Sequence, residues 1–252
     1  AKFLDIKYKE LRFLVYHRDV VTIDHYIRYK IPKRRGGLRS IAAPKTILKK
    51  TQRSILDKIL SKVKGSPHTH GFLEYKSVIS SAKVHPKSPS LLIDLNIIDF
   101  LHSITFERVR GTFLSLGYSG CISTLLSMIC TFCERIPIKV GNEVKYVALT
   151  PRILPQGSPA SPMITNIICR RLDKRLSGLA KKFGFVYTRY ADDLSFSTKY
   201  ETEENIGRFC GLIYQIIEEN PKFSEDDVAW QLIEEMSAKA AELLKPVFDR
   251  EK

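Results

Sequence analysis

Two adjacent acidic residues inside a hairpin pattern constrain this chain more than any other feature. The stretch Tyr187-Thr-Arg-Tyr-Ala-Asp-Asp-Leu-Ser-Phe-Ser197 places Asp192 and Asp193 between runs of apolar and β-branched residues. That alternation predicts two strands joined by a tight turn. Neighbouring carboxylates in such a turn repel each other and lose hydration. A divalent cation such as Mg²⁺ relieves both penalties, because it prefers hard oxygen ligands; a solvated acidic turn is the alternative.

The composition is that of a folded protein. The 252 residues are 44% hydrophobic, which suffices for a substantial core in one or two domains. No apolar run is long enough to span a bilayer, and the first residues lack a signal-peptide pattern, so we expect a cytoplasmic protein. The five cysteines show no paired metal-ligand spacing, which predicts reduced thiols in the core.

The net charge of +14 is unevenly distributed along the chain. Residues 201–252 contain 13 acidic and 6 basic residues, so the other 200 residues contain 14 acidic and 35 basic ones. A folded body with that excess of cations predicts a polyanionic partner. Charge alone does not distinguish nucleic acid from a membrane surface.

A second hairpin pattern lies near the N-terminus and is crowded with cations. It follows a region over residues 5–30 that we expect to be helical, with a strand as the alternative at Tyr26–Tyr29, where the chain leads into the hairpin. The stretch Ile31–Pro44 has Gly36 and Gly37 at its predicted turn. Four cations surround that turn: Lys33, Arg34, Arg35 and Arg39. Such a hairpin suits a triphosphate or a phosphate backbone, although a solvated charged hairpin explains the pattern equally well.

The segment between the two hairpins adds a strand with polar residues inside it. After an amphipathic helix predicted over Lys45–Lys64, an apolar strand over Ser90–Ile98 carries Asp94 and Asn96. These two residues are two positions apart and therefore face the same side. Polar groups inside such a strand need a hydrogen-bond partner or a metal ion.

A loop rich in proline precedes the acidic hairpin. It reads Leu154-Pro-Gln-Gly-Ser-Pro-Ala-Ser-Pro162, with Ser161 as the predicted N-cap of a helix over Met163–Leu179. Its Gln156 side chain and backbone N–H groups are available to meet a flat or anionic ligand.

These motifs, in this order, resemble the fingers and palm of a bacterial reverse transcriptase of the retron type. Two further stretches fit, Thr69-His-Gly-Phe-Leu73 and Ser81-Ala-Lys-Val-His85, the latter resembling the retron element Asn-Ala-x-x-His with Ser81 in place of Asn. The resemblance implies an α+β fold, with right-hand polymerase fingers and palm and an antiparallel palm sheet packed on helices. We expect a fingers-like basic region over residues 1–90, a palm over 91–220 and an acidic C-terminal helix within 221–252.

The resemblance also implies RNA-directed DNA polymerisation by two Mg²⁺ ions, with Mn²⁺ as an alternative. A structured RNA template, a DNA primer or nascent DNA, and dNTPs would be the partners, with no membrane involved. Asp192 and Asp193 match catalytic metal ligands. The dNTP-binding positions correspond to Lys33, Arg39, Leu101, Gln156 and Gly157. The nucleic-acid-binding positions correspond to Arg34, Arg35, Arg189 and Tyr190. A role in antiviral defence follows by analogy alone.

The upstream strand departs from the family pattern. The family reads Asp-Leu-x-Asp-Phe-Phe-Pro-Ser-Ile, and alignment without a gap through Asp99 puts Asn96 at the catalytic Asp position. An amide oxygen is a weaker metal ligand than a carboxylate, so we expect impaired metal binding and catalysis. An insertion of two residues would instead make Asp94 the ligand and would preserve the strand face. The ungapped register also places Leu101 where the family has an aromatic residue that excludes the ribose 2′-hydroxyl.

The family's thumb elements are not recognisable after the palm. Ser224-Glu-Asp-Asp227 instead predicts the cap of an acidic helix through Leu244, suited to packing or to a protein partner. Without a thumb we expect a weak grip on a primer–template duplex. Two functions therefore stay open. One is a retron-type RNA-directed DNA polymerase, in a form that is shortened or that is inactive because of Asn96. The other is a non-catalytic RNA-binding scaffold derived from one.

Overall fold

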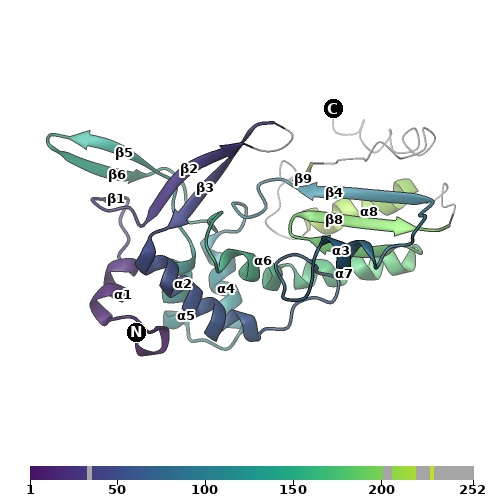
Figure 1. The fold of residues 1–252 in the computed structure, drawn as a ribbon, viewed down its shortest axis with the longest axis horizontal. Coiled ribbons are helices and arrows are strands. Elements are labelled where there is room, and N and C mark those ends of the chain that lie inside the picture. Colours follow the sequence, from purple (N-terminus) through teal and green to yellow (C-terminus); the bar gives the residue numbers. More distant parts are fainter. Residues whose placement is uncertain (33–35, 201–205, 220–227, 230–252) are drawn as a thin grey trace. The chain divides into compact units, whose positions relative to one another are not determined.

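The computed structural model describes residues 1–32, 36–200, 206–219 and 228–229. The chain forms two compact units, each built from two separate stretches (Figure 1). The first unit comprises Ala1–Lys64 and Leu101–Ile168, and the second comprises Gly65–Phe100 and Cys169–Lys252. These units interleave along the chain, whereas the fingers-and-palm division expected above is consecutive. That division stays a prediction.

The first unit combines helices with two small antiparallel sheets. One sheet has the strand order β1-β6-β5, and the other is the β2–β3 hairpin. The strands are β1 (Val20–Val21), β2 (Tyr26–Pro32), β3 (Leu38–Pro44), β5 (Arg135–Val140) and β6 (Glu143–Ala148). The helices are the 3₁₀ turns η1 (Lys2–Leu4) and η2 (Leu60–Lys62), and α1 (Tyr8–Val15), α2 (Thr46–Lys58), α4 (Phe106–Ser115), α5 (Gly120–Cys130) and α6 (Ser161–Ile168).

The cationic hairpin predicted in this unit is present as β2 and β3. Gly36 and Gly37 follow β2 with φ of 90° and 80°, in the left-handed region that glycine tolerates best. The helix expected over residues 5–30 is wrong after Val15, where α1 ends. Val20 lies in a strand instead and pairs with Val147 on β6. The strand expected at Tyr26–Tyr29 is present, and its Ile27 pairs with Ala43 on β3. Backbone pairing with the distant strand β6 stabilises an extended conformation at Val20 and Val21 in place of the helix.

The second unit is a four-stranded antiparallel sheet whose core face is covered by helices α7 (Arg170–Lys182) and α8 (Ile206–Glu218) (Figure 1). The strand order is β7-β8-β4-β9. The strands are β4 (Leu91–Ile97), β7 (Val186–Tyr190), β8 (Asp193–Thr198) and β9 (Val228–Ala229), and the helices are α3 (Val78–Ala82), α7 (Arg170–Lys182) and α8 (Ile206–Glu218). The antiparallel sheet packed on helices expected from the resemblance is confirmed.

The alternation of β4 separates a core face from a polar face. Ile93, Leu95 and Ile97 are each 1% exposed and pack in the core formed with α7 and α8, whereas Asp94 and Asn96 are half-buried on the opposite face. This is the period of two that the sequence predicted. The polar face of the sheet is therefore the face on which the acidic residues gather.

Two expectations about helices are corrected. The helix expected over Met163–Leu179 is two helices, because α6 ends at Ile168 and α7 begins at Arg170. Helix α6 is buried on most of its surface and α7 on one face, so the two helices meet different surroundings. Ser161 lies inside α6, and its hydroxyl donates to the Pro155 carbonyl at 2.8 Å instead of capping the helix.

The acidic helix expected within residues 221–252 lies outside the described residues, with one exception. Val228 and Ala229 form β9, which pairs with Ile97 and Asn96 of β4, so the helix expectation is wrong at these two positions. The five cysteines all lie in the described ranges, where none forms a disulfide and four are buried, in agreement with the expected reduced thiols. Within the described ranges, no helix combines the length and apolar character needed to cross a membrane.

Candidate active site

The acidic pair lies at the turn between β7 and β8, as predicted. Tyr190 and Asp193 are Cα partners at the ends of the two strands, with Ala191 and Asp192 between them. Ala191 has a φ of 57°, a left-handed conformation that costs a non-glycine residue about 1–2 kcal/mol. The backbone carbonyl of Asp192 accepts a hydrogen bond from the Ile97 N–H at 3.1 Å, which ties the turn to the end of β4. The Asp193 side chain is exposed.

Asn96, and not Asp94, lies beside the acidic turn. Asn96 is the Cα partner of Asp193, and its Nδ2 donates to Asp193 Oδ1 at 2.7 Å. Asp94 is instead the partner of Ser195, two pairs further from the turn. Its Oδ1 is buried and has no hydrogen-bond partner among the described residues. The structure therefore places Asn96, and not Asp94, directly opposite Asp193.

The donor set suits a hard cation but is poorer than three carboxylates. Asp192, Asp193 and Asn96 supply carboxylate and amide oxygens, which are ligands of the type Mg²⁺ prefers. One oxygen of Asp193 is already engaged by the Asn96 amide N–H. Over the part of the chain that the structure describes, no three His, Cys, Asp or Glu side chains form a group able to hold a metal ion. The residues present fit cation binding with one negative charge fewer than the family pattern.

His85 forms hydrogen bonds with two strands on the polar face of the sheet. Its Nδ1 lies 2.6 Å from Ser197 Oγ and its Nε2 lies 2.7 Å from Thr188 Oγ1, which Ser81 Oγ also contacts at 2.8 Å. Burial lowers the pKa of the His85 imidazole, and the nearby Asp94 carboxylate opposes that shift. These contacts give His85 and Ser81 a packing role, because they tie the α3 segment to β7 and β8.

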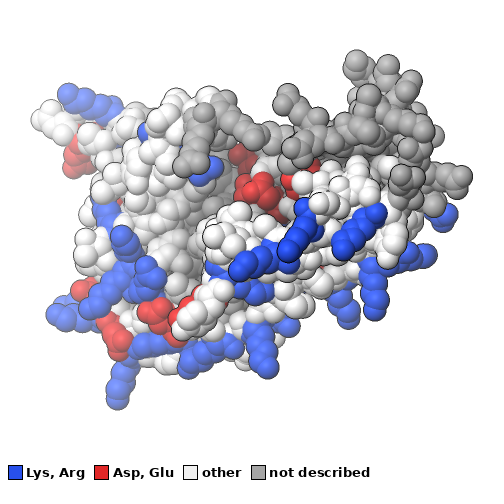
Figure 2. Space-filling view, turned by 45° about the vertical axis from the view of Figure 1, so that its right-hand side comes forward, with Lys and Arg blue, Asp and Glu red and all other residues white. Residues whose placement is uncertain are grey.

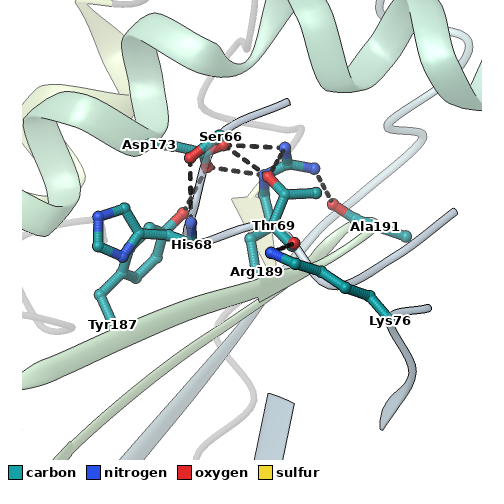
Figure 3. Close-up of polar contacts among 8 residues, drawn as sticks. All are labelled: Ser66, His68, Thr69, Lys76, Asp173, Tyr187, Arg189 and Ala191. Atoms are coloured by element: carbon teal, nitrogen blue, oxygen red, sulfur yellow. Dashed lines mark hydrogen bonds and ion pairs between the residues drawn. The ribbon is translucent and has the colours of Figure 1, made fainter. Parts of the chain in front are cut away.

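Arg189 does not meet the expectation that it binds nucleic acid. Its side chain is 0% exposed, and it forms a buried ion pair with Asp173 of α7 (Figure 3). The expectation failed because strand alternation turns Arg189 toward the helices together with Tyr187, whereas Tyr190 is half-buried at the end of the strand. Asp173 was not predicted as a partner, although a charged residue on the apolar face of a helix indicates that it has a buried partner.

The residues expected to bind dNTPs lie in the first unit. Arg39 is exposed on β3, and the Gln156 carbonyl accepts a hydrogen bond from the Ala42 N–H on the same strand at 2.8 Å. Gly157 has a φ of 129°, and a Cβ there would lie 2.9 Å from the Ala42 carbonyl oxygen. The glycine thus lets the loop lie directly against β3. Leu101 is half-buried in the turn before Ile104. Lys33, Arg34 and Arg35 lie outside the described residues.

One protein family matches most of the chain. The family described as "Reverse transcriptase (RNA-dependent DNA polymerase)" matches residues 31–229 of the chain. The chain belongs to the reverse transcriptase family. This reverse transcriptase chain is 42% identical over 197 residues to the retron Mx162 reverse transcriptase of Myxococcus xanthus, a match that covers 78% of this chain and 40% of that protein.

Other retron proteins are similar over the same part of this reverse transcriptase chain. It is 40% identical over 197 residues to the retron Mx65 reverse transcriptase of M. xanthus, covering 78% of this chain and 46% of that one. It is 34% identical over 199 residues to the retron Ec86 reverse transcriptase of Escherichia coli, covering 79% and 56%. The chain thus spans about half the length of the curated relatives it matches.

Solved structures support the fold of this reverse transcriptase chain. Telomerase from Candida albicans, solved with a fragment of telomeric RNA, superposes with a TM-score of 0.52 at 11% identity, covering 92% of this chain and 45% of that one. Telomerase from Candida tropicalis gives 0.52 at 14% identity, covering 86% and 43%. At such low identity the likeness is one of fold, and it confirms the expected α+β fingers-and-palm architecture.

Proposed function

We propose that the chain carries the polymerase region of a retron-type RNA-directed DNA polymerase whose metal site is weakened by Asn96. Its substrates are a structured RNA template, a DNA primer or nascent DNA, and dNTPs. The identity to retron reverse transcriptases supports the class of reaction. The contact of 2.7 Å between Asn96 Nδ2 and Asp193 Oδ1 supports the weakened metal site.

In the second unit, Asp192, Asp193 and the amide oxygen of Asn96 would hold Mg²⁺ or Mn²⁺. A cation held there would supply Lewis-acid assistance to the transfer of a nucleotide onto a primer 3′-hydroxyl. The neutral Asn96 side chain adds no charge to this site, and its N–H competes for an oxygen of Asp193. Two carboxylates attract a divalent cation less strongly than three, so we expect slow nucleotide incorporation.

In the first unit, the cationic hairpin and the Gln156–Gly157 loop bind the incoming nucleotide. Arg39, with Lys33, attracts the triphosphate, because guanidinium and ammonium groups pair with phosphate oxygens. The loop is held against β3 by the Ala42–Gln156 hydrogen bond, which gives its backbone a defined position. Leu101 offers less bulk than an aromatic ring near the ribose, so discrimination against ribonucleotides is weaker than in the family pattern.

Primer extension with Mg²⁺ tests the proposal. The Asn96→Asp variant should incorporate dNTPs at least about tenfold faster than the unchanged chain, which corresponds to about 1.4 kcal/mol of transition-state stabilisation. Asp94→Asn is the matched control, because it changes the neighbouring polar residue on the same strand face. It should leave incorporation unchanged. Rapid incorporation by the unchanged chain that Asp94→Asn abolishes would assign the ligand role to Asp94 instead.

A non-catalytic RNA-binding scaffold is the second candidate. The Asn96–Asp193 hydrogen bond favours it, because it provides one Asp193 oxygen with a partner without any cation. The net charge of +14 favours it as well, and Lys and Arg side chains gather along the lower part of the face shown in Figure 2. Structured RNA that binds the unchanged chain, together with no incorporation by Asn96→Asp, would decide for the scaffold. A cytoplasmic location and a role in antiviral defence stay predictions for either function.

A further inference from the structure

A buried ion pair lies on the helix-facing side of the sheet, next to the acidic turn. Arg189 of β7 and Asp173 of α7 are both 0% exposed. The guanidinium donates from Nε to Asp173 Oδ1 at 2.8 Å and from Nη2 to Oδ2 at 3.0 Å, so the pair is bidentate (Figure 3). A charge pair taken out of water is tolerated only when its hydrogen bonds are well satisfied. The pair therefore needs further hydrogen-bond partners, and the surrounding residues supply them.

Two hydroxyl groups complete the bonding of the Asp173 carboxylate. Thr69 Oγ1 donates to Oδ2 at 2.9 Å and accepts from Arg189 Nη2 at 2.8 Å. Tyr187 donates its phenolic O–H to Oδ1 at 2.9 Å. Burial, and then the Asp173 charge, raises the pKa of Tyr187, so the phenol keeps its proton. Arg189 is thus held from several directions and has little freedom to move.

The remaining end of the guanidinium reaches the turn itself. Arg189 Nη1 donates to the backbone carbonyl of Ala191 at 2.9 Å. Ala191 is the residue with a φ of 57°, and it directly precedes Asp192. A strained residue keeps its conformation only where its surroundings determine it. The contact from Arg189 is one such determinant.

A strap formed by residues 68–71 presses on the same turn. The Arg189 N–H donates to the His68 carbonyl at 2.9 Å, and the His70 N–H donates to the Arg189 carbonyl at 2.8 Å. Lys76 Nζ donates to the Thr69 carbonyl at 2.7 Å and fixes the strap from outside. At Gly71 an added Cβ would lie 2.6 Å from the Ala191 nitrogen, closer than real contacts allow. The strap therefore requires glycine where it meets the turn.

We propose that Arg189, held by Asp173 and Thr69, is a positioning residue that fixes the Ala191 turn and thereby the orientation of the Asp192 and Asp193 carboxylates. The proposal deepens the proposed function and rests on it. Supporting residues of this kind matter because metal ligands must be held within about 0.5 Å of their working geometry. Lysine does not replace Arg189, because one ammonium group cannot form the bidentate pair and also reach the Ala191 carbonyl.

Amide hydrogen exchange, compared between variants and the unchanged chain, tests whether Arg189 fixes the Ala191 turn. Arg189→Lys should speed exchange in the peptide that covers residues 189–194, because it loses the contact with Ala191. Gly71→Ala, which pushes on the same residue from the strap, should do the same and serves if Arg189→Lys does not fold. Tyr187→Phe is the matched control, since it removes one hydrogen bond from Asp173 and leaves the Arg189–Ala191 contact in place. Its turn should exchange like that of the unchanged chain.

Terbium luminescence tests the consequence for cation binding. With Asn96→Asp as the parent, Tb³⁺ is titrated, and the signal lost in a further Asp193→Asn variant defines the site. Arg189→Lys and Gly71→Ala should raise the Tb³⁺ dissociation constant on the order of tenfold, as loss of a supporting contact does elsewhere, and Tyr187→Phe should leave it within about twofold. Unchanged affinity and exchange in both variants would overturn the positioning role alone. A parent without site-specific Tb³⁺ binding would overturn the proposed function as well.

Discussion

Asn96 Nδ2 lies 2.7 Å from Asp193 Oδ1, and the two residues are Cα partners across the antiparallel pair of β4 and β8. Side chains at such positions have Cβ atoms about 5 Å apart, so their polar groups interact directly. An amide opposite a carboxylate gives a satisfied pair in the absence of any cation. Two carboxylates in these positions would repel each other until a cation bound between them.

The first prediction concerns the stability of Asn96→Asp. Without divalent cations this variant should lose about 0.2–1 kcal/mol of unfolding free energy, because like charges lie directly opposite each other. Millimolar Mg²⁺ should restore the loss by binding the folded state. Thermal unfolding with and without EDTA measures both effects. Asn142→Asp, at an exposed hairpin turn, is the matched control and should show no such Mg²⁺ dependence; equal Mg²⁺ responses in the two variants would contradict the prediction.

The second prediction compares two glycines. Gly157→Ala should lower the unfolding free energy by about 1–3 kcal/mol, because the new Cβ would lie 2.9 Å from the Ala42 carbonyl oxygen at a φ of 129°. Gly178→Ala, on the outer face of α7 where a Cβ meets nothing within 4 Å, should raise it by about 0.4–1 kcal/mol. Denaturant unfolding measures both changes. A loss of stability in Gly178→Ala, or none in Gly157→Ala, would contradict the contacts on which the prediction rests.

Local patterns of two kinds were sufficient to predict much of the fold. The period of two in β4 placed Asp94 and Asn96 on one face, and the turn glycines Gly36 and Gly37 marked a hairpin that the structure contains. Both signals are read from residues close together in the chain. The acidic hairpin was predictable for the same reason, since its strands are joined by two residues.

Features that depend on distant partners were not predictable. Arg189 meets Thr69 and Asp173, which lie 120 and 16 residues away in the chain. The end of α1 at Val15 depends likewise on pairing between β1 and β6. In each case a tertiary contact overrides local propensity. The position of Asn96 beside Asp193 was reached by aligning motifs, and strand periodicity alone allowed Asp94 equally well.

The third prediction is a pH dependence at His85. Burial, only partly opposed by Asp94, lowers the pKa of His85 in the folded state below its ordinary value near 6.5. The unfolded chain therefore binds the proton more readily, and unfolding free energy falls as pH decreases below about 6.5. Part of that slope should disappear in His85→Asn. Imidazole titration by NMR checks the cause directly, and a midpoint at or above the ordinary value would contradict it.

The outer face of α7 provides the last prediction, which concerns RNA binding. Exposed cations follow one side of this helix at helical spacing: Arg170, Arg171, Lys174, Lys181 and Lys182. The acid of the same helix, Asp173, is buried with Arg189, so it does not offset these charges. On α2, by contrast, the exposed cations are accompanied by an exposed acid, Asp57. We therefore expect α7 to contribute more phosphate contacts than α2.

Binding of structured RNA as a function of salt concentration measures that difference. Neutralising Arg170, Lys174 and Lys181 to glutamine should weaken binding and reduce the magnitude of the slope of log K against log salt by about 2, since each phosphate contact contributes roughly 0.7–0.9. The matched control neutralises Lys49, Lys50 and Arg53 of α2, which removes the same charge from another helix. Its slope should change by less than half as much. Equal changes in the two triple variants would show that RNA responds to net charge alone, with no contact surface on α7.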